Sequence, residues 1–186
     1  MAFAQLLGDT LKGKNGNVPT QEALEGKVVG LYFSAHWCPP CRGFTPTLSK
    51  LYSDIVGQGK NFELVFVSSD KDETSFNEYY EEMPWLALPF DDRDRKGQLS
   101  NQFQVKGIPT LVLLDEEGKV YTTDGRGAVA ENPEGFPWKP KTVAELLGDE
   151  LTGKNGPLPL SSIQGKKLAL YFSAHRPSPS ATFLGC

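Results

Sequence analysis

The sequence has few of the residues from which metal sites and disulfide-rich folds are built. Three cysteines and two histidines occur among 186 residues, too few for a small secreted scaffold held by disulfide bonds. No apolar run approaches the roughly 18 residues of a membrane-spanning helix. Residues 1–9 contain neither a basic segment nor a long apolar one, so we expect no secretory signal and a reducing, cytoplasmic location.

Positive charge is not concentrated anywhere either. The chain has 19 Lys and Arg against 23 Asp and Glu, a formal net charge of −4. Since no basic run is present, we expect neither nucleic acid nor a membrane surface among the partners. Apolar residues other than glycine make up 39% of the chain. That share is usual for a globular protein, and the length allows one domain of about 100–150 residues with residues to spare.

Two parts of the sequence resemble each other. Residues 6–9 recur as 146–149, residues 13–16 as 153–156 and, after a gap of one residue, residues 31–36 as 170–175. The similarity ends where residues 37–41 (WCPPC) are answered by residues 176–180 (RPSPS). We predict a complete domain at residues 1–147 and the truncated start of a second copy at 148–186. This second part is too short to fold alone, so we expect it to be disordered or loosely docked. It should not catalyse, because Pro177 and Ser180 replace the two cysteines.

Alternating periods of hydrophobicity predict an α/β domain. Short apolar runs indicate buried strands, and apolar residues three and four apart indicate helices. Pro46 should bend the long helix that contains it. The predicted order is strand 28–34, helix 39–56, strand 62–68, helix 73–83 capped by Asp70 or Asp72, an extended piece 86–90, helix 95–103, a hairpin of strands 110–115 and 119–123, and helix 141–147. This order favours a central mixed sheet with a parallel core and an antiparallel edge, flanked by helices.

Cys38 and Cys41 carry the chemistry that the sequence predicts. Thiol–disulfide exchange needs one thiolate that attacks and a second thiol that resolves the mixed disulfide. Cysteines three residues apart at the start of a helix lie on one face, with Cβ atoms about 5–6 Å apart. The helix N-terminus favours the thiolate of the first cysteine, and Pro39 suits the first helical turn. We expect Cys38 to be the exposed nucleophile and Cys41 the buried resolving thiol.

A metal site and a purely structural disulfide are less favoured interpretations of this segment. A zinc site needs a second pair of ligands, which Cys186, His36 and His175 supply poorly, so we predict no metal. A structural disulfide across so short a loop would stabilise little. Trp37 stands beside the nucleophile at the end of a buried strand, so we expect its ring to face substrate and His36 to be a solvated loop residue. Before Pro109 the local sequence gives no reason to expect a cis bond, since a proline is tolerated at a strand's first residue.

Residues 32–42 (YFSAHWCPPCR) resemble the nucleoredoxins and, more broadly, the tryparedoxins. Residues 67–70 (VSSD), 83–89 (MPWLALP), 107–110 (GIPT) and 136–138 (FPW) do so as well, in the same order. The resemblance implies a thioredoxin-like fold, exchange with disulfides of protein substrates, and a cytoplasmic or nuclear location. It also implies a cis Ile108–Pro109 bond facing the Cys38–Cys41 pair. The residues that then face the substrate are Trp37, Pro39, Pro40, Ile108 and Pro109.

One position departs from thioredoxin itself. Six residues before the nucleophile, thioredoxins keep a buried aspartate that handles the proton of the resolving thiol. This chain has Tyr32 there, as in the tryparedoxin branch. Water or another group must therefore deprotonate Cys41.

The leading hypothesis is a protein-disulfide reductase that works by ping-pong exchange without a bound cofactor. Its redox-active disulfide, Cys38–Cys41, would be reduced again by glutathione, another dithiol protein or an NAD(P)H-linked reductase. A redox-switched binding module in signalling is an alternative, because multi-unit family members are linked to signalling proteins of the Dishevelled type. A peroxidase of the same fold is a further alternative, which the paired cysteines disfavour.

Overall fold

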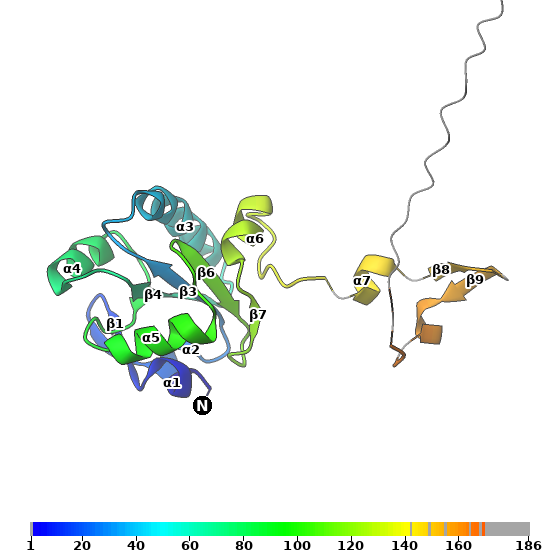
Figure 1. Cartoon of the computed structure of the whole chain (residues 1–186), viewed down its shortest axis with the longest axis horizontal. Coiled ribbons are helices and arrows are strands. Elements are labelled where there is room, and N and C mark those ends of the chain that lie inside the picture. Colours follow the sequence, from blue (N-terminus) through cyan, green and yellow to red (C-terminus); the bar gives the residue numbers. More distant parts are fainter. Residues whose placement is uncertain are drawn as a thin grey trace, which may run out of the picture. The chain divides into compact units, whose positions relative to one another are not determined.

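The structure is a computed structural model that describes residues 2–141, 143–148, 150–154, 156–163, 165–167 and 169. The chain forms two compact units that divide after Pro140 (Figure 1). The boundary expected from the sequence lies after residue 147, and the helix between the two positions belongs to the second unit. The predictions for Pro177, Ser180, His175 and Cys186 fall outside the described residues.

A seven-stranded mixed sheet forms the centre of the first unit, which confirms the predicted fold class. Its order is β2-β1-β5-β4-β3-β6-β7. β3, β4 and β5 run parallel, whereas β6, β7, β1 and β2 add antiparallel pairs at the two edges. The strands are β1 (Thr10–Gly13), β2 (Gly16–Pro19), β3 (Val28–Ser34), β4 (Phe62–Ser68), β5 (Leu86–Ala87), β6 (Thr110–Leu114) and β7 (Val120–Thr122).

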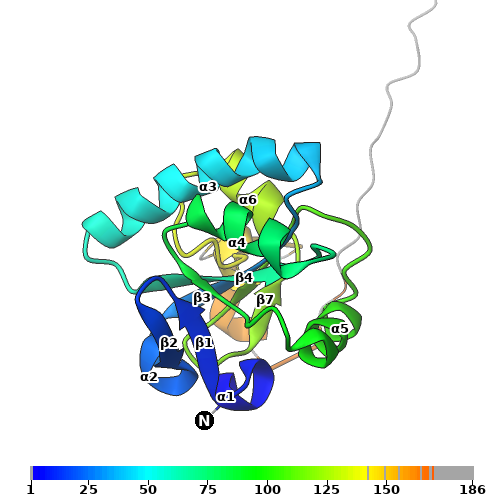
Figure 2. The same ribbon diagram turned by 90° about the vertical axis from the view of Figure 1, so that its left-hand side faces the viewer.

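The two central strands are apolar along most of their length because helices cover both sides of the sheet. Every residue of β3 and β4 is buried, as is usual for parallel strands between two helical layers. One layer is α3 (Pro39–Gly57), α4 (Glu73–Glu81) and α6 (Gly125–Glu131), and the other is α1 (Ala2–Leu7), α2 (Thr20–Leu24) and α5 (Arg93–Gln102). Figure 2 shows the two layers above and below the sheet.

The structure adds elements that the hydrophobic pattern does not predict. β1 and β2 form a hairpin of four residue pairs, and α6 begins at Gly125 with Asp124 as its N-cap. Pro46 lies inside α3, which extends over 19 residues. Of the two aspartates proposed to cap α4, Asp72 does so, through a hydrogen bond from the backbone N–H of Ser75.

The second unit contains a short helix, a hairpin and one turn of 3-10 helix. These are α7 (Val143–Leu147), β8 (Glu150–Gly153), β9 (Gly156–Pro159) and η1 (Leu160–Ile163). Lys167 and Ala169, the last two described residues, are not in a strand. Among the helices of the described ranges, none is long and apolar enough to cross a membrane.

Gly125 provides a test of how closely α6 packs on the sheet. A Cβ at this position would lie 2.8 Å from the carbonyl oxygen of Leu111, so Gly125→Ala must displace backbone or helix. We expect the free energy of unfolding to fall by about 1–3 kcal/mol, measured as a lower urea midpoint at unchanged slope. Gly97→Ala in α5 is the control, since nothing lies within 4 Å of the added carbon. It should gain roughly 0.5–1 kcal/mol. Equal effects of the two substitutions would contradict the packing argument.

Tyr80 should make the first unit less stable at strongly alkaline pH. Its hydroxyl donates to the carbonyl oxygens of Trp85 (2.8 Å) and Lys12 (3.0 Å), and burial raises its pKa to about 12 from 10.0. The folded state therefore favours the neutral phenol. The contribution of the neutral Tyr80 phenol to the free energy of unfolding is complete below pH 10 and is lost as the pH rises towards 12. We expect urea midpoints to fall across this window and Tyr80→Phe to fall less steeply. A parallel decline in the two proteins would refute this assignment.

Candidate active site

Cys38 and Cys41 lie at the N-terminus of α3, directly beyond the end of β3. Cys38 is the N-cap, with extended backbone dihedrals, and prolines occupy the next two positions. The two sulfurs form a disulfide, with Cα atoms 5.2 Å apart. The pair can therefore store and release two electrons as a disulfide and a dithiol.

The start of α3 surrounds the Cys38 sulfur with backbone dipoles. The N–H of Cys41 donates to Cys38 Sγ over 3.3 Å, as the side chain of an N-cap residue accepts from the first turn. The same N–H also lies 3.1 Å from the Cys38 carbonyl oxygen. A first-turn N–H that points at sulfur stabilises the thiolate over the thiol. In the dithiol state this geometry favours Cys38 as the sulfur that carries negative charge.

The exposure predicted for Cys38 is wrong. Its side chain is 4% exposed, against 0% for Cys41. The reason is the loop before β6, which brings Ile108 onto the pair and places the Ile108 carbonyl oxygen 3.8 Å from Cys38 Sγ. The difference between the two cysteines is in the predicted direction, although both are buried.

The residues predicted to face substrate differ in exposure. Trp37 is 56% exposed, and its indole N–H donates to the carbonyl oxygen of Ser69 over 3.2 Å. Pro39 and Pro40 are exposed, Ile108 is half-buried and Pro109 is buried. The Ile108–Pro109 bond is cis. Pro109 is thus less available than predicted, because it packs at the start of β6.

Two open hollows flank the site. One lies beside Trp37 and is lined by Lys71, Asp72 and Ser75. The other lies beside Pro109 and includes Thr110, Asp124 and Arg126. The first is bounded by the start of α4 and the second by α6, and neither is lined by a cysteine.

Asp70, which the sequence predicts only as a candidate cap for the helix at 73–83, lies beside the active-site loop. It is 1% exposed. Its Oδ1 accepts the backbone N–H of His36 over 2.7 Å, and its Oδ2 accepts the hydroxyl of Ser68 over 2.8 Å. Arg93 donates to the carbonyl oxygens of Ser68 and Asp70. Asp70 therefore fastens the loop before Trp37 and Cys38 to the end of β4.

His36 is held more firmly than a solvated loop residue. Its ring stacks on Tyr79, with centroids 5.4 Å apart and planes 11° apart. Its Nδ1 lies 3.7 Å from Oε2 of Glu78, and its carbonyl oxygen accepts from Arg42. The imidazole thus packs on α4, beside the loop that leads to Cys38.

Buried hydroxyl groups lie beneath Cys41. The hydroxyl of Tyr32 lies 2.9 Å from Oγ1 of Thr45 and 3.3 Å from the Cys41 carbonyl oxygen. Thr45 in turn contacts the hydroxyl of Tyr79 at 2.5 Å and donates to the Cys41 carbonyl oxygen. Burial raises the pKa of Tyr32 well above its usual range, so this phenol stays neutral. Tyr32 acts here as a hydrogen-bonding group and not as an ionised substitute for aspartate.

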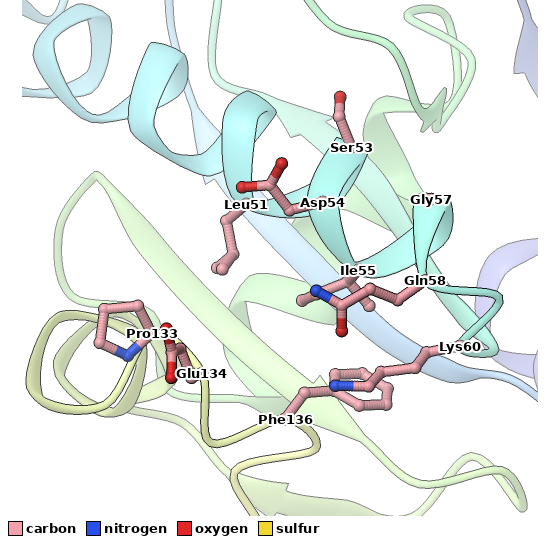
Figure 3. Close-up of a pocket in the computed structure, with 10 residues that line it drawn as sticks. All are labelled: Leu51, Ser53, Asp54, Ile55, Gly57, Gln58, Lys60, Pro133, Glu134 and Phe136. Carbon is pink, nitrogen blue, oxygen red and sulfur yellow. The ribbon is translucent and has the colours of Figure 1, made fainter.

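A larger hollow at the far end of α3 is separate from the cysteines. Figure 3 shows Leu51, Ile55 and Phe136 along it, with the Lys60 ammonium over the Phe136 ring. From Cys41 to Ile55 the helix rises about 20 Å. In the described part of the chain, no group of three or more His, Cys, Asp or Glu is placed to hold a metal ion.

The chain is similar to known proteins over most of the first unit. A family model described as thioredoxin-like matches residues 26–120. The chain is 46% identical over 146 residues to nucleoredoxin from Danio rerio, covering 77% of this chain and 35% of that protein. It is 48% identical to tryparedoxin from Trypanosoma brucei brucei, covering 69% of this chain and 90% of that protein.

The fold agrees with a solved structure in this group. Tryparedoxin I from Crithidia fasciculata superposes with a TM-score of 0.70 at 43% identity, covering 76% of this chain and all of that one. The chain spans about a third of the length of the curated nucleoredoxins that it matches.

Substitutions at Asp70 separate its shape from its charge. Asp70→Asn can still accept the His36 N–H and can donate to Ser68, whereas Asp70→Ala leaves the half-buried His36 N–H and the buried Ser68 hydroxyl without this acceptor. We expect Asp70→Ala to cost about 1–3 kcal/mol of stability and to slow alkylation of reduced Cys38 by iodoacetamide. Asp70→Asn should retain most of the stability. Alkylation of the alanine variant at the wild-type rate would show that the loop does not depend on Asp70.

Proposed function

Because the chain belongs to the thioredoxin-like family of nucleoredoxins and tryparedoxins, we propose that it reduces disulfide bonds in other proteins. The observation that carries the proposal is the position of Cys38. Its sulfur accepts an N–H from the start of α3 and is paired with Cys41 one turn away. This is the arrangement that nucleophilic exchange at sulfur requires.

The reaction begins with the thiolate of Cys38. It attacks one sulfur of a substrate disulfide, so that a Cys38–substrate bond forms and the second substrate sulfur leaves as a thiolate that takes up a proton. The sulfur of Cys41, after losing its proton to water, attacks Cys38 Sγ and displaces the remaining substrate sulfur. Two electrons have then passed to the substrate, and Cys38 and Cys41 are joined as a disulfide.

The surroundings of the cysteines support an extended protein segment as the substrate. Trp37, Pro39 and Pro40 are exposed and uncharged, and the hollows beside Trp37 and Pro109 add polar and charged side chains. The backbone of Ile108 lies beside Cys38 Sγ, where main-chain groups of a substrate would be in reach. A peptide held across these groups brings its disulfide to the sulfur of Cys38.

Repeated turnover needs an external reductant. Glutathione, another dithiol protein or an NAD(P)H-linked reductase would return two electrons to the Cys38–Cys41 disulfide. No further group has to be bound for this exchange. We place the activity in a reducing compartment, the cytoplasm or the nucleus, because such reductants keep the pair in its dithiol form there.

Insulin reduction driven by dithiothreitol tests the roles of the two cysteines. Cys38→Ser should abolish catalysis, because no nucleophile is left. Reduced Cys41→Ser, mixed with insulin after dithiothreitol has been removed, should accumulate a mixed disulfide with the substrate, visible as a reducible adduct by mass spectrometry. Cys186→Ser is the matched control and should retain full activity.

Three measurements separate the alternatives: insulin reduction, peroxide consumption and partner binding. Activity of Cys38→Ser equal to wild type would refute the mechanism. Direct consumption of peroxide without a second protein would instead support a peroxidase. Slow turnover together with partner binding that persists in a Cys38→Ser, Cys41→Ser protein would support a binding module.

A further inference from the structure

Residues 143–163, as far as the structure describes them, repeat the structure of residues 2–24. We call residues 2–24 the first module and residues 143–163 the second module. Each has a helix, a hairpin and a final helical turn in the same order. The hairpins pair in the same register: Thr10↔Pro19 to Gly13↔Gly16 in the first module, and Glu150↔Pro159 to Gly153↔Gly156 in the second.

The turns of the two modules also match. Gly8 has φ 87° and Gly148 74°, whereas Gly16 has φ 120° and Gly156 115°. The one-residue gap in the sequence repeat falls where the five residues of α2 are replaced by the four residues of η1. The second module is thus a structural copy of the first and not merely a related sequence.

In the first unit the rest of the domain covers the module. Leu7, Leu11 and Leu24 are 0% exposed, and they pack with the side chains of the central strands and α5. On the edge away from β2, β1 pairs with β5 through Lys12 and Ala87. The sheet and α5 therefore form a receptor that is shaped for this module.

The same side of the second module is not covered to this extent. Leu146 and Leu158 are 68% and 46% exposed, and Leu151 and Ile163 are half-buried where Leu11 and Leu24 are fully buried. In the part of the chain that the structure describes, β8 has β9 as its one strand partner. An apolar face beside a free strand edge favours association with another sheet.

We infer that the second module binds the first unit of a second copy of this chain, in the place of that copy's first module. The occupant follows from the repeat, because the surface that covers the first module is complementary to its structural copy. β8 would pair with β5 in the register of β1, so that Thr152 takes the place of Lys12 opposite Ala87. This differs from domain swapping, in which copies exchange an identical element, because here a related module displaces the first one.

The contacts at the receptor determine how readily the two modules exchange. Arg95 donates to the carbonyl oxygens of Gln5 and Leu6, which any backbone of this shape provides. Lys14, which donates to the Tyr80 carbonyl oxygen, has its counterpart in Lys154. The hydrogen bond from Lys12 to Asn77 has no counterpart, because Thr152 stands at the position of Lys12 and its side chain is too short to reach Asn77. The first module binds more tightly in its own chain, so the exchanged dimer is a minority form that refolding at high protein concentration should populate.

Crosslinking between two full-length chains tests the exchange. All chains carry Cys38→Ser, Cys41→Ser and Cys186→Ser, which keeps the redox pair out of the experiment and makes it independent of the proposed activity. One chain carries Ala87→Cys, a position that is 0% exposed, and a tagged partner carries Thr152→Cys. The two are unfolded together in urea, refolded together and oxidised. Ser161→Cys, at an exposed position of η1, replaces Thr152→Cys in the control.

We expect a disulfide-linked heterodimer for the 87/152 pair and its loss in the 87/161 control. Adding Leu151→Asp to the tagged chain should remove the heterodimer, because an aspartate cannot enter the site of Leu11. As a check of the register, Lys12→Cys with Ala87→Cys in one chain should crosslink within the monomer. Heterodimer no more abundant than in the 87/161 control would overturn the proposal. So would a Thr152→Cys, Ala87→Cys chain that crosslinks within its own monomer.

Discussion

The parallel pairing of β3 with β4 is the constraint on which the site depends. Seven residue pairs, from Val28↔Phe62 to Ser34↔Ser68, bring the carboxyl ends of the two strands side by side. The chain leaves β3 towards Cys38 and leaves β4 towards Asp70, whose carboxylate joins the two exits through the N–H of His36. A register shift of one residue would turn the buried side chains of the strand to the opposite face. The position of the nucleophile therefore follows from the packing of the sheet.

Backbone groups, more than charged side chains, surround the reactive sulfur. Cys38 Sγ lies near the N–H of Cys41 and the carbonyl oxygen of Ile108. Beneath Cys41 the polar groups are hydroxyls, and burial holds the pKa of Tyr32 above its usual range. The carboxylate of Asp70 is directed at a loop N–H and a serine hydroxyl instead. Reactivity in such a site depends on where two loops are held, because a dipole acts strongly only at short range.

The two modules have the same local structure but differ in burial. Both copies form the same hairpin register and turn at glycines with positive φ, which a short sequence can specify by itself. Leu11 and Leu151 nevertheless differ in burial, because burial depends on what lies across the sheet. An isolated two-stranded hairpin is marginally stable in water, so the first copy owes its stability to β5 and to the central strands.

The sequence by itself determined the α/β order, the apolar strands 28–34 and 62–68, and the pair Cys38 and Cys41 at the start of a helix, because these follow from local periods and spacing. It did not reveal β1 and β2, whose short strands lack an alternating apolar pattern, or the glycine-rich α6. The tertiary structure alone decided that Cys38 is covered, since Ile108 lies 70 residues along the chain. It also decided that Asp70 fastens the loop before Cys38, since its partner His36 lies 34 residues earlier in the chain. Contacts of this kind depend on how distant segments pack, which neighbouring residues do not encode.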